Sequence, residues 1–578
     1  MKNKLYKSLL LIVALIMVFT AGCQPTDVVE PTDAAVEETD EAPVEEETEA
    51  PADDDDVTEE PTEAVQEPSV LRQPANEPSG LDPALGGYGY QEYVSLYEPL
   101  VDSFSPSGEI TPLAAENFTV SDDVLVYTFV LREGLLWSDG TPLTAEDFRL
   151  SWLRQLAPET ASYSPHEFYP IVNAQAYNAG EITDPNEVGI TAVDERTLVV
   201  ELEQATPHFL YYVGNTNFVP VRVDLIEEYG DQWMEAGNFV GNGPYMLTQW
   251  DHDQLLVLEP NPYYNGIWKD YVKVDRIEYV LMADAWNQAV PSFETGEVDV
   301  AIVPASELSR LQEDPEYSDM LTNVSISGSQ VLIIDTKNPP TDDVRVRQAL
   351  SLAIDRLTLA DAVLRGAYAP ADSLSPPDLA SYNPDEAFGY QYNPELAAEL
   401  LAEAGYPDGE GFPPFEVAYW SVDLASLVMQ TIQAMWKQNL GIDVTLNPIE
   451  PAAMRDWRIS RNETPFNMYY GLNWCGIPDA SEFHNALFDP SNSLKRSRYD
   501  NPEYIDLILN AFTEMDTETR NQMYKDAEAI VNEEVPIISL FYESQTWLVR
   551  PEVKNFKEIT SAVASMFRYA QPPGLEIE

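Results

Sequence analysis

An acidic tract near the N-terminus sets the first limit on how this chain can fold. From Gln24 to Glu67 the sequence holds 19 acidic residues and no basic or aromatic residue. Because like charges repel and nothing in the tract can pack, we expect an extended, disordered spacer there. Folding is therefore expected to begin after Pro68.

A short apolar run precedes the tract. Residues 1–22 carry three lysines and then an uncharged stretch, which is typical of a secretory signal. The stretch is shorter than the about 20 apolar residues of a membrane span. It ends in Thr20-Ala21-Gly22-Cys23, which resembles the cleavage site of bacterial lipoproteins, although Thr20 stands where Leu is more usual. We expect Cys23 to be lipidated and to hold the mature protein outside the cytoplasmic membrane, in the periplasm or at the cell surface.

The charge of the chain excludes some partners. The formal charge of −68 falls only to −52 without the 19 acidic residues of the tract and the three lysines of the leader. Nucleic acid and anionic membrane surfaces are thus excluded as natural partners. If Cys23 is lipidated, Cys475 has no cysteine to pair with, so stability must come from a hydrophobic core. The length predicts two or three packed units.

The rest of the chain has the pattern of a mixed α/β protein. Apolar residues alternate at 125–134 and 197–204, which predicts strands. Residues 393–405 predict a helix, because they begin with a capping Asn and a Pro and end in Gly. An amphipathic helix over 424–440 leads through Gly441 into a β-branched strand, the helix-to-strand step of an α/β layer.

A series of motifs resembles one known family. The run VLVYTFVLREGLLWSDGTPLTAEDFRLSWLRQLAPETASYS, at 124–164, is similar to the signature of the family 5 extracellular solute-binding proteins, the oligopeptide, dipeptide and nickel receptors of ABC importers. Five further segments stand in the family's order: LDP (81–83), LYEPL (96–100), GNGPYML (241–247), VRQALSLAIDR (346–356) and MYKDAEAIVNEEVPIISLFY (523–542). Within the first run we interpret Trp137 to Gly140 as a tight turn before a helix, with a structural role.

The resemblance implies a bilobal, type II periplasmic-binding-protein-like α/β fold with an extra subdomain and two hinge-crossing strands. We expect VLIIDT (331–336) and PIISLFY (536–542) to be the crossings. Two backbone connections form a hinge, and a ligand that contacts both lobes favours the closed state. The expected limits are a signal peptide at 1–22, the lipidated Cys and linker at 23–68, lobe one at 69–330 with its subdomain at about 115–240, lobe two at 331–535, and a return to lobe one at 536–578.

The resemblance also indicates a ligand-binding loop. In oligopeptide-binding members a loop that reads roughly Trp-Cys-Ala-Asp-Tyr contacts the ligand, and its Asp pairs with the ligand's α-amino group. The residues that match its first three places are Trp474, Cys475 and Gly476. Ile477 occupies the place of the Asp. Either Asp479 or Glu98 supplies the missing carboxylate, or the ligand lacks a free amine.

Further ligand contacts follow from the same resemblance. Tyr163, Trp420 and Tyr542 fall where family members present aromatic walls, although each is as well explained as a core residue. Arg461 lies near the place where some peptide binders hold a carboxylate end.

The sequence offers little for an enzyme. The four histidines form no H-E-x-x-H pair, and there is no G-x-S-x-G motif. Cys475 with His484 is better explained as a thiol beside a loop histidine than as a catalytic pair. We expect no catalytic residue, metal or cofactor.

The predicted function is a monomeric receptor that delivers short peptides to ABC permease subunits and meets the membrane only through its lipid. The alternatives are an oligosaccharide or nickel-chelate receptor with this fold and, less favoured, an extracellular hydrolase.

Overall fold

The computed structural model describes residues 68–85, 90–103, 110–206, 208–377, 379–450, 453–454, 466–474, 480–481, 484, 497–514, 516–556 and 576–577. The chain divides into Met1–Gln66 and Glu67–Glu578, and all described residues belong to the second unit. The leader, Cys23 and the whole acidic spacer therefore lie outside the described residues. Within the described ranges, every helix is too short or too polar to cross a bilayer.

A four-stranded sheet forms the centre of lobe one. Its order is β1 (Val70–Asn76), β10 (Arg276–Met282), β9 (Leu255–Pro260) and β8 (Tyr245–Asp251). The N-terminal strand β1 pairs parallel with β10, while the other neighbours are antiparallel. Leu71, Ile277 and Leu256 are fully buried in the core beneath this sheet. The helices of this region are α2 (Tyr90–Leu96), α6 (Val223–Tyr229), α7 (Ala285–Thr295) and α8 (Ala305–Glu313).

A second four-stranded sheet, with its own core, forms the subdomain of lobe one. The order is β4 (Ala115–Val120), β5 (Val126–Leu131), β7 (Thr197–Glu201) and β6 (Ile190–Ala192), all antiparallel. Helix α3 (Ala145–Leu156) contributes Trp152 and Phe148 to this core. The predicted turn at 137–140 is confirmed: Asp139 accepts the N–H of Thr141 at 2.9 Å, and Gly140 has a φ of +82°. Shorter elements are β2 (Val101–Asp102), β3 (Thr111–Pro112), α4 (Ala174–Asn178) and α5 (Phe209–Val213).

A seven-stranded sheet forms the centre of lobe two and continues into lobe one, where Val300, Val324 and Trp547 join the core of that lobe. The order is β11 (Val300–Ile302), β17 (Ile537–Val549), β12 (Leu321–Ile334), β16 (Met468–Trp474), β14 (Phe415–Trp420) and β15 (Val444–Ile449), with β13 (Ala369–Pro370) added beside β17. The predicted helix-to-strand step is confirmed, because α12 (Asp423–Leu440) ends at Gly441 and leads into β15. The other predicted helix is α11 (Pro394–Glu403), where the Asn393 side chain accepts the N–H of Leu396.

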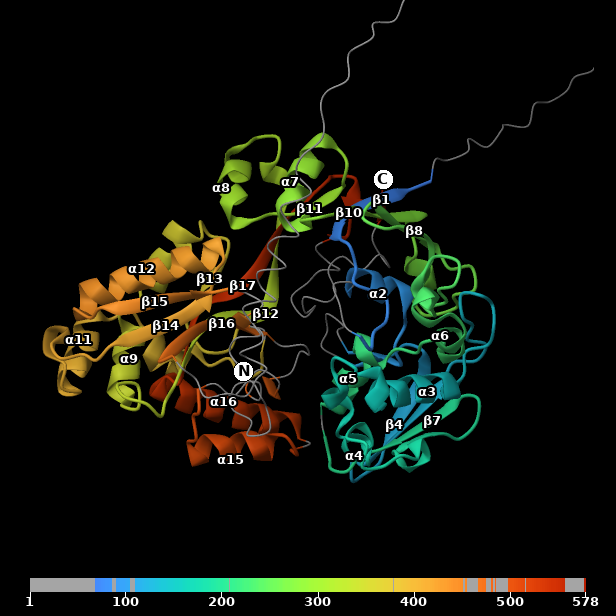
Figure 1. The fold of residues 1–578 in the computed structure, drawn as a ribbon, viewed down its shortest axis with the longest axis horizontal. Coiled ribbons are helices and arrows are strands. Elements are labelled where there is room, and N and C mark those ends of the chain that lie inside the picture. The colour runs from blue at the N-terminus through green and yellow to red at the C-terminus, as the bar shows by residue number, and fades with distance from the viewer. Residues whose placement is uncertain are drawn as a thin grey trace, which may run out of the picture. The chain divides into compact units, whose positions relative to one another are not determined.

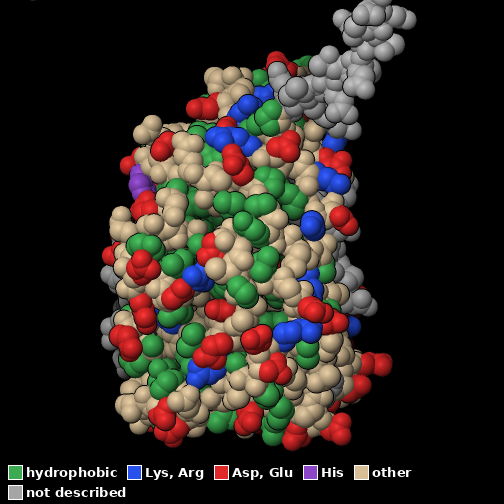
Figure 2. Space-filling model, turned by 90° about the vertical axis from the view of Figure 1, so that its right-hand side faces the viewer, with side chains coloured by type: hydrophobic (Ala, Val, Ile, Leu, Met, Phe, Trp, Pro, Cys, Tyr) green, Lys and Arg blue, Asp and Glu red, His purple; other side chains and the backbone are tan. Residues whose placement is uncertain are grey.

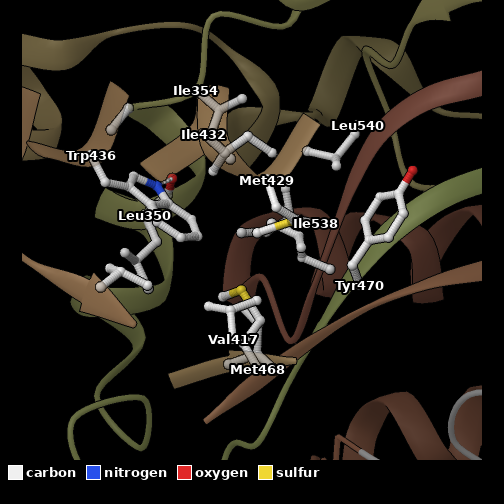
Figure 3. Packing of buried hydrophobic residues seen from close by; sticks show 14 of the residues in the cluster. Leu350, Ile354, Val417, Met429, Ile432, Trp436, Met468, Tyr470, Ile538 and Leu540 are labelled. Atoms are coloured by element: carbon white, nitrogen blue, oxygen red, sulfur yellow. Dashed lines mark hydrogen bonds between the residues drawn. The ribbon is translucent and has the colours of Figure 1, made fainter. Parts of the chain in front are cut away.

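Helices cover both faces of this sheet, so its strands are apolar on both sides. Leu332 and Ile538 point into the core formed with α9 (Val344–Leu352), α11 and α12. That core contains Trp436 and Ile432 of α12 (Figure 3). The neighbouring Ile333 of β12 instead packs into a second core with α15 (Pro502–Ala511) and α16 (Thr517–Glu534). This alternation is expected of a strand buried on both faces. The remaining short elements are α10 (Arg356–Thr358), β18 (Val553–Lys554) and β19 (Glu576–Ile577).

Two long strands join the two lobes. β12 and β17 pair antiparallel from Leu321 opposite Leu548 to Ile333 opposite Ile537. Near one end Val324 and Trp547 belong to the core of lobe one, and near the other Leu332 and Ile538 belong to that of lobe two (Figure 1). Of the predicted crossing segments, residues 331–334 lie in β12 and residues 537–542 lie in β17. The pairing is interrupted between Ser325 and Ser329, so the passage between the cores precedes the predicted segment 331–336.

Candidate functional site

Two of the sequence motifs, LYEPL and GNGPYML, pack directly against each other in lobe one. The Glu98 N–H donates to Asn242 Oδ1 at 3.0 Å, and Asn242 Nδ2 donates to the Glu98 carbonyl at 2.8 Å. A Cβ at Gly243 would stand 2.4 Å from the Ser95 carbonyl oxygen, so only glycine allows the two backbones to approach this closely. This contact gives both motifs a structural role, because it holds two segments of lobe one together.

Glu98 is held by groups of lobe one itself. Its side chain is buried, and its carboxylate accepts hydrogen bonds from the Arg132 guanidinium and the Tyr264 hydroxyl. Burial raises the pKa of Glu98 to about 7, against the opposing effects of Arg132 and Tyr264. In this structure the charge of Glu98 is satisfied without a ligand, and its role as a ligand contact stays a prediction.

The LDP motif fixes the N-terminal segment to the subdomain. Arg154 of α3 reaches both carboxylate oxygens of Asp82, with an Nη1–Oδ1 distance of 3.0 Å. The Asp82 side chain is 2% exposed and that of Arg154 is 17% exposed. The pair is therefore a buried, bidentate salt bridge.

The VRQALSLAIDR motif holds the beginning of the crossing strand β17. Arg356 is buried, and its Nε donates to the carbonyl of Ser539 in β17 at 2.8 Å, while Nη2 donates to Ser351 Oγ at 2.7 Å. Burial lowers the pKa of Arg356 to about 10, which still leaves it charged at neutral pH. Arg347, at the start of the motif, donates to the carbonyl of Glu534 at 2.8 Å. The motif therefore ties the core of lobe two to the hinge.

Some of the predicted ligand contacts meet at the crossing strands. Tyr542 of β17 lies opposite Ser329 of β12, and the backbone of Trp474 in β16 lies opposite Gly328 of β12. Tyr542 is 6% exposed, and its hydroxyl donates to Asp372 Oδ1 at 2.8 Å. Two predicted residues thus flank neighbouring positions of β12.

The other described candidates lie elsewhere. Trp420 ends β14, packs partly buried against the second core of lobe two, and its indole N–H has no hydrogen-bond partner in the described part of the chain. Tyr163 lies in lobe one and is 71% exposed, with its N–H donating to the Ala84 carbonyl at 2.9 Å. The remaining predicted site residues lie outside the part of the chain that the structure describes. They are Cys23, Arg461, Cys475, Gly476 and Asp479, together with the side chain of Trp474.

No sequence motif indicates the buried polar network of lobe two. Glu528 of α16 accepts the N–H of Ser375 at 2.8 Å and the Ser373 hydroxyl at 2.6 Å. His484 Nε2 lies 3.5 Å from Glu528, and Nδ1 lies 3.0 Å from the Tyr504 hydroxyl. Burial raises the pKa of Glu528 to about 7 and lowers that of His484 to about 3, so His484 is neutral at physiological pH. His484 thus belongs to the packing of lobe two.

The sequence decides which family this architecture belongs to. Residues 109–495 match the family described as "Bacterial extracellular solute-binding proteins, family 5 Middle". The chain belongs to this family. Its members are binding proteins of transporters. Across the described residues, no group of three His, Cys, Asp or Glu side chains is arranged to hold a metal ion.

Known proteins resemble this solute-binding protein over most of its length. It is 33% identical over 477 residues to YgiS of Escherichia coli K12, named "Probable deoxycholate-binding periplasmic protein", covering 81% of this chain and 86% of the relative. It is 31% identical to the periplasmic murein peptide-binding protein MppA of the same organism, covering 86% and 91%. The solved unliganded, open structure of MppA superposes with a TM-score of 0.74 at 29% identity, covering 89% of this chain and 98% of that one. The first of these names refers to deoxycholate and the second to a murein peptide.

Proposed function

We propose that this solute-binding protein captures short peptides outside the cytoplasmic membrane and delivers them to the permease subunits of an ABC importer. The observation that carries the proposal is the combined match in sequence and fold to MppA, whose name describes it as a murein peptide-binding protein. Lipidated Cys23 anchors a monomer, and the acidic spacer separates the lobes from the membrane.

The proposed ligand lies at the crossing strands and is held by both lobes. The position of Tyr542 and Trp474 on either side of β12 supports this placement. We include Trp420 and Tyr163 as further contacts, because large rings suit peptides with varied side chains. Cys475, Gly476 and Asp479 of the predicted loop are included as well, and Arg461 is proposed for a carboxylate end of the ligand. The proposed limits are 69–330 for lobe one, 331–535 for lobe two and 536–578 for the return to lobe one.

Native mass spectrometry of the purified full-length protein tests this function. The protein is first measured alone, and then after incubation with a library of two- to five-residue peptides or with deoxycholate. We expect the protein to retain library peptides. Retention of deoxycholate with no peptide from the library would contradict the proposal and assign the site to amphipathic carboxylic acids, the class that the name of YgiS indicates.

A further inference from the structure

We propose that Asp372, together with Tyr542 and Tyr382, forms a binding site for a cationic group of the ligand, either an ammonium or a guanidinium. The inference rests on the proposed function, because it takes the cation to be part of a bound peptide. Neither the sequence motifs nor the resemblance pointed to Asp372 or to Tyr382.

The three side chains form a cluster that is fixed from two sides. The Tyr542 hydroxyl donates to Asp372 Oδ1 at 2.8 Å, and the Tyr382 hydroxyl donates to Oδ2 at 3.0 Å. The two rings stand 6.5 Å apart at an angle of 78°. The segment that carries Asp372 is itself fixed, because β13 pairs with β17 at Tyr542 and the Ser373 N–H donates to the Tyr542 hydroxyl at 3.0 Å. The carboxylate is therefore held in place before any ligand arrives.

Asp372 has no cationic partner among the residues that the structure describes. The side-chain hydrogen bonds to its carboxylate, as far as the described residues show, come only from the two neutral tyrosine hydroxyls. Asp82, Glu98 and Asp335 contrast with it, since each pairs with an arginine and is buried. Asp372 instead remains exposed, and an ionised carboxylate has lone pairs beyond those that two hydroxyls use.

Such a cluster has the chemistry of a cation site. A cation beside Asp372 would form charge-assisted hydrogen bonds with the carboxylate. The half-buried ring of Tyr382 attracts the same group through its quadrupole, whereas Tyr542, only 6% exposed, contributes its hydroxyl. Acidic side chains are also spread over the face of the protein seen in Figure 2, and a chain with this net charge concentrates cations near its surface.

The cluster lies where a ligand of both lobes has to bind. Tyr542 faces Ser329, at the end of the interruption in the β12–β17 pairing where the strands pass between the two cores. A ligand favours the closed state only if it binds the closed arrangement of the lobes more tightly than the open one. Groups beside the hinge strands can contact the ligand in both the open and the closed arrangement. Asp372 is therefore positioned to select for cationic peptides.

Isothermal titration calorimetry on the full-length protein tests this site with four peptides: Ala-Ala-Ala, Ala-Lys-Ala and their N-acetylated forms. In Asp372→Asn, we expect peptides whose cation occupies the site to bind about ten-fold more weakly or worse, since hydrogen bonds to charged groups are the strong ones. Acetylated trialanine, which has no cation, should change less than about two-fold. A loss for Ala-Ala-Ala assigns the site to the α-ammonium, and a loss for acetyl-Ala-Lys-Ala assigns it to the lysine side chain.

Two variants control for indirect effects. Glu399→Gln removes an equal charge from the exposed side of α11 and should leave all four affinities unchanged. Tyr382→Phe keeps the ring but removes one hydroxyl from Asp372, and should weaken only the cationic peptides. Equal weakening of all four peptides in Asp372→Asn, or none, would overturn the cation site. If the wild-type protein retains library peptides but binds none of these four, the cation site fails and the proposed function stands; if it retains no library peptide, both fail.

Discussion

Asp82→Asn is expected to lower the free energy of unfolding by about 3–5 kcal/mol, because it removes one partner of a buried ion pair and leaves the other charge uncompensated. The side chains of Asp82 and Arg154 are 2% and 17% exposed, and the guanidinium bonds to both carboxylate oxygens. An amide can accept only one of these bonds and carries no charge to balance Arg154. The measurement is urea denaturation of the purified full-length protein, followed by far-UV circular dichroism.

Glu116→Gln is the matched control for this prediction. Glu116 also pairs with an arginine, Arg196, but the two side chains are 58% and 40% exposed. Loss of an exposed pair costs about 0–1 kcal/mol. If both substitutions cost the same small amount, Asp82 would not fix the N-terminal segment, and the structural explanation of the LDP motif would be wrong.

Arg356→Ala is expected to destabilise the protein by about 4 kcal/mol, because it leaves a cavity and removes donors from buried acceptors. The lost contacts include those to the carbonyl of Ser539 at 2.8 Å and to Ser351 Oγ at 2.7 Å, and the guanidinium also lies 4.9 Å from the Tyr390 ring centroid. Ser539 belongs to the crossing strand β17, so the same substitution loosens the hinge. Thermal unfolding by differential scanning calorimetry measures the effect.

Arg365→Ala removes the same side chain from a nearby exposed position. Arg365 has no hydrogen bond or ion pair within the described part of the chain, so the expected change is within about 0.5 kcal/mol. A similarly small loss for Arg356→Ala would show that β17 is held without the VRQALSLAIDR motif.

The sequence predicted the elements whose signals are local. The cap at Asn393 and the stop at Gly441 are chemical signals within one turn of the helix ends, and both occur where expected. The two crossing strands were found through the family resemblance. The interruption of their pairing between Ser325 and Ser329 was not predicted, because the apolar pattern of each strand does not show where the strand leaves one core and enters the other.

Pairings over long sequence separations could not be predicted. Glu98 was proposed as a ligand contact because it is a charged residue in a motif, but Arg132 and Tyr264 lie 34 and 166 residues away and satisfy it. Asp372 and Tyr542 are 170 residues apart, and Asp372 lies in a loop with no periodic pattern. Only the fold shows that Asp372, which has no cationic partner within the described ranges, lies beside the hinge.

Small-angle X-ray scattering tests most directly the claim that the two lobes close over a peptide by turning about β12 and β17. The radius of gyration of the full-length protein is compared without ligand and with a saturating amount of a peptide retained in the mass spectrometry experiment. We expect the radius to fall when the peptide binds, as in hinge closure. An unchanged radius, with the peptide shown to be bound in the same sample, would contradict capture by lobe closure.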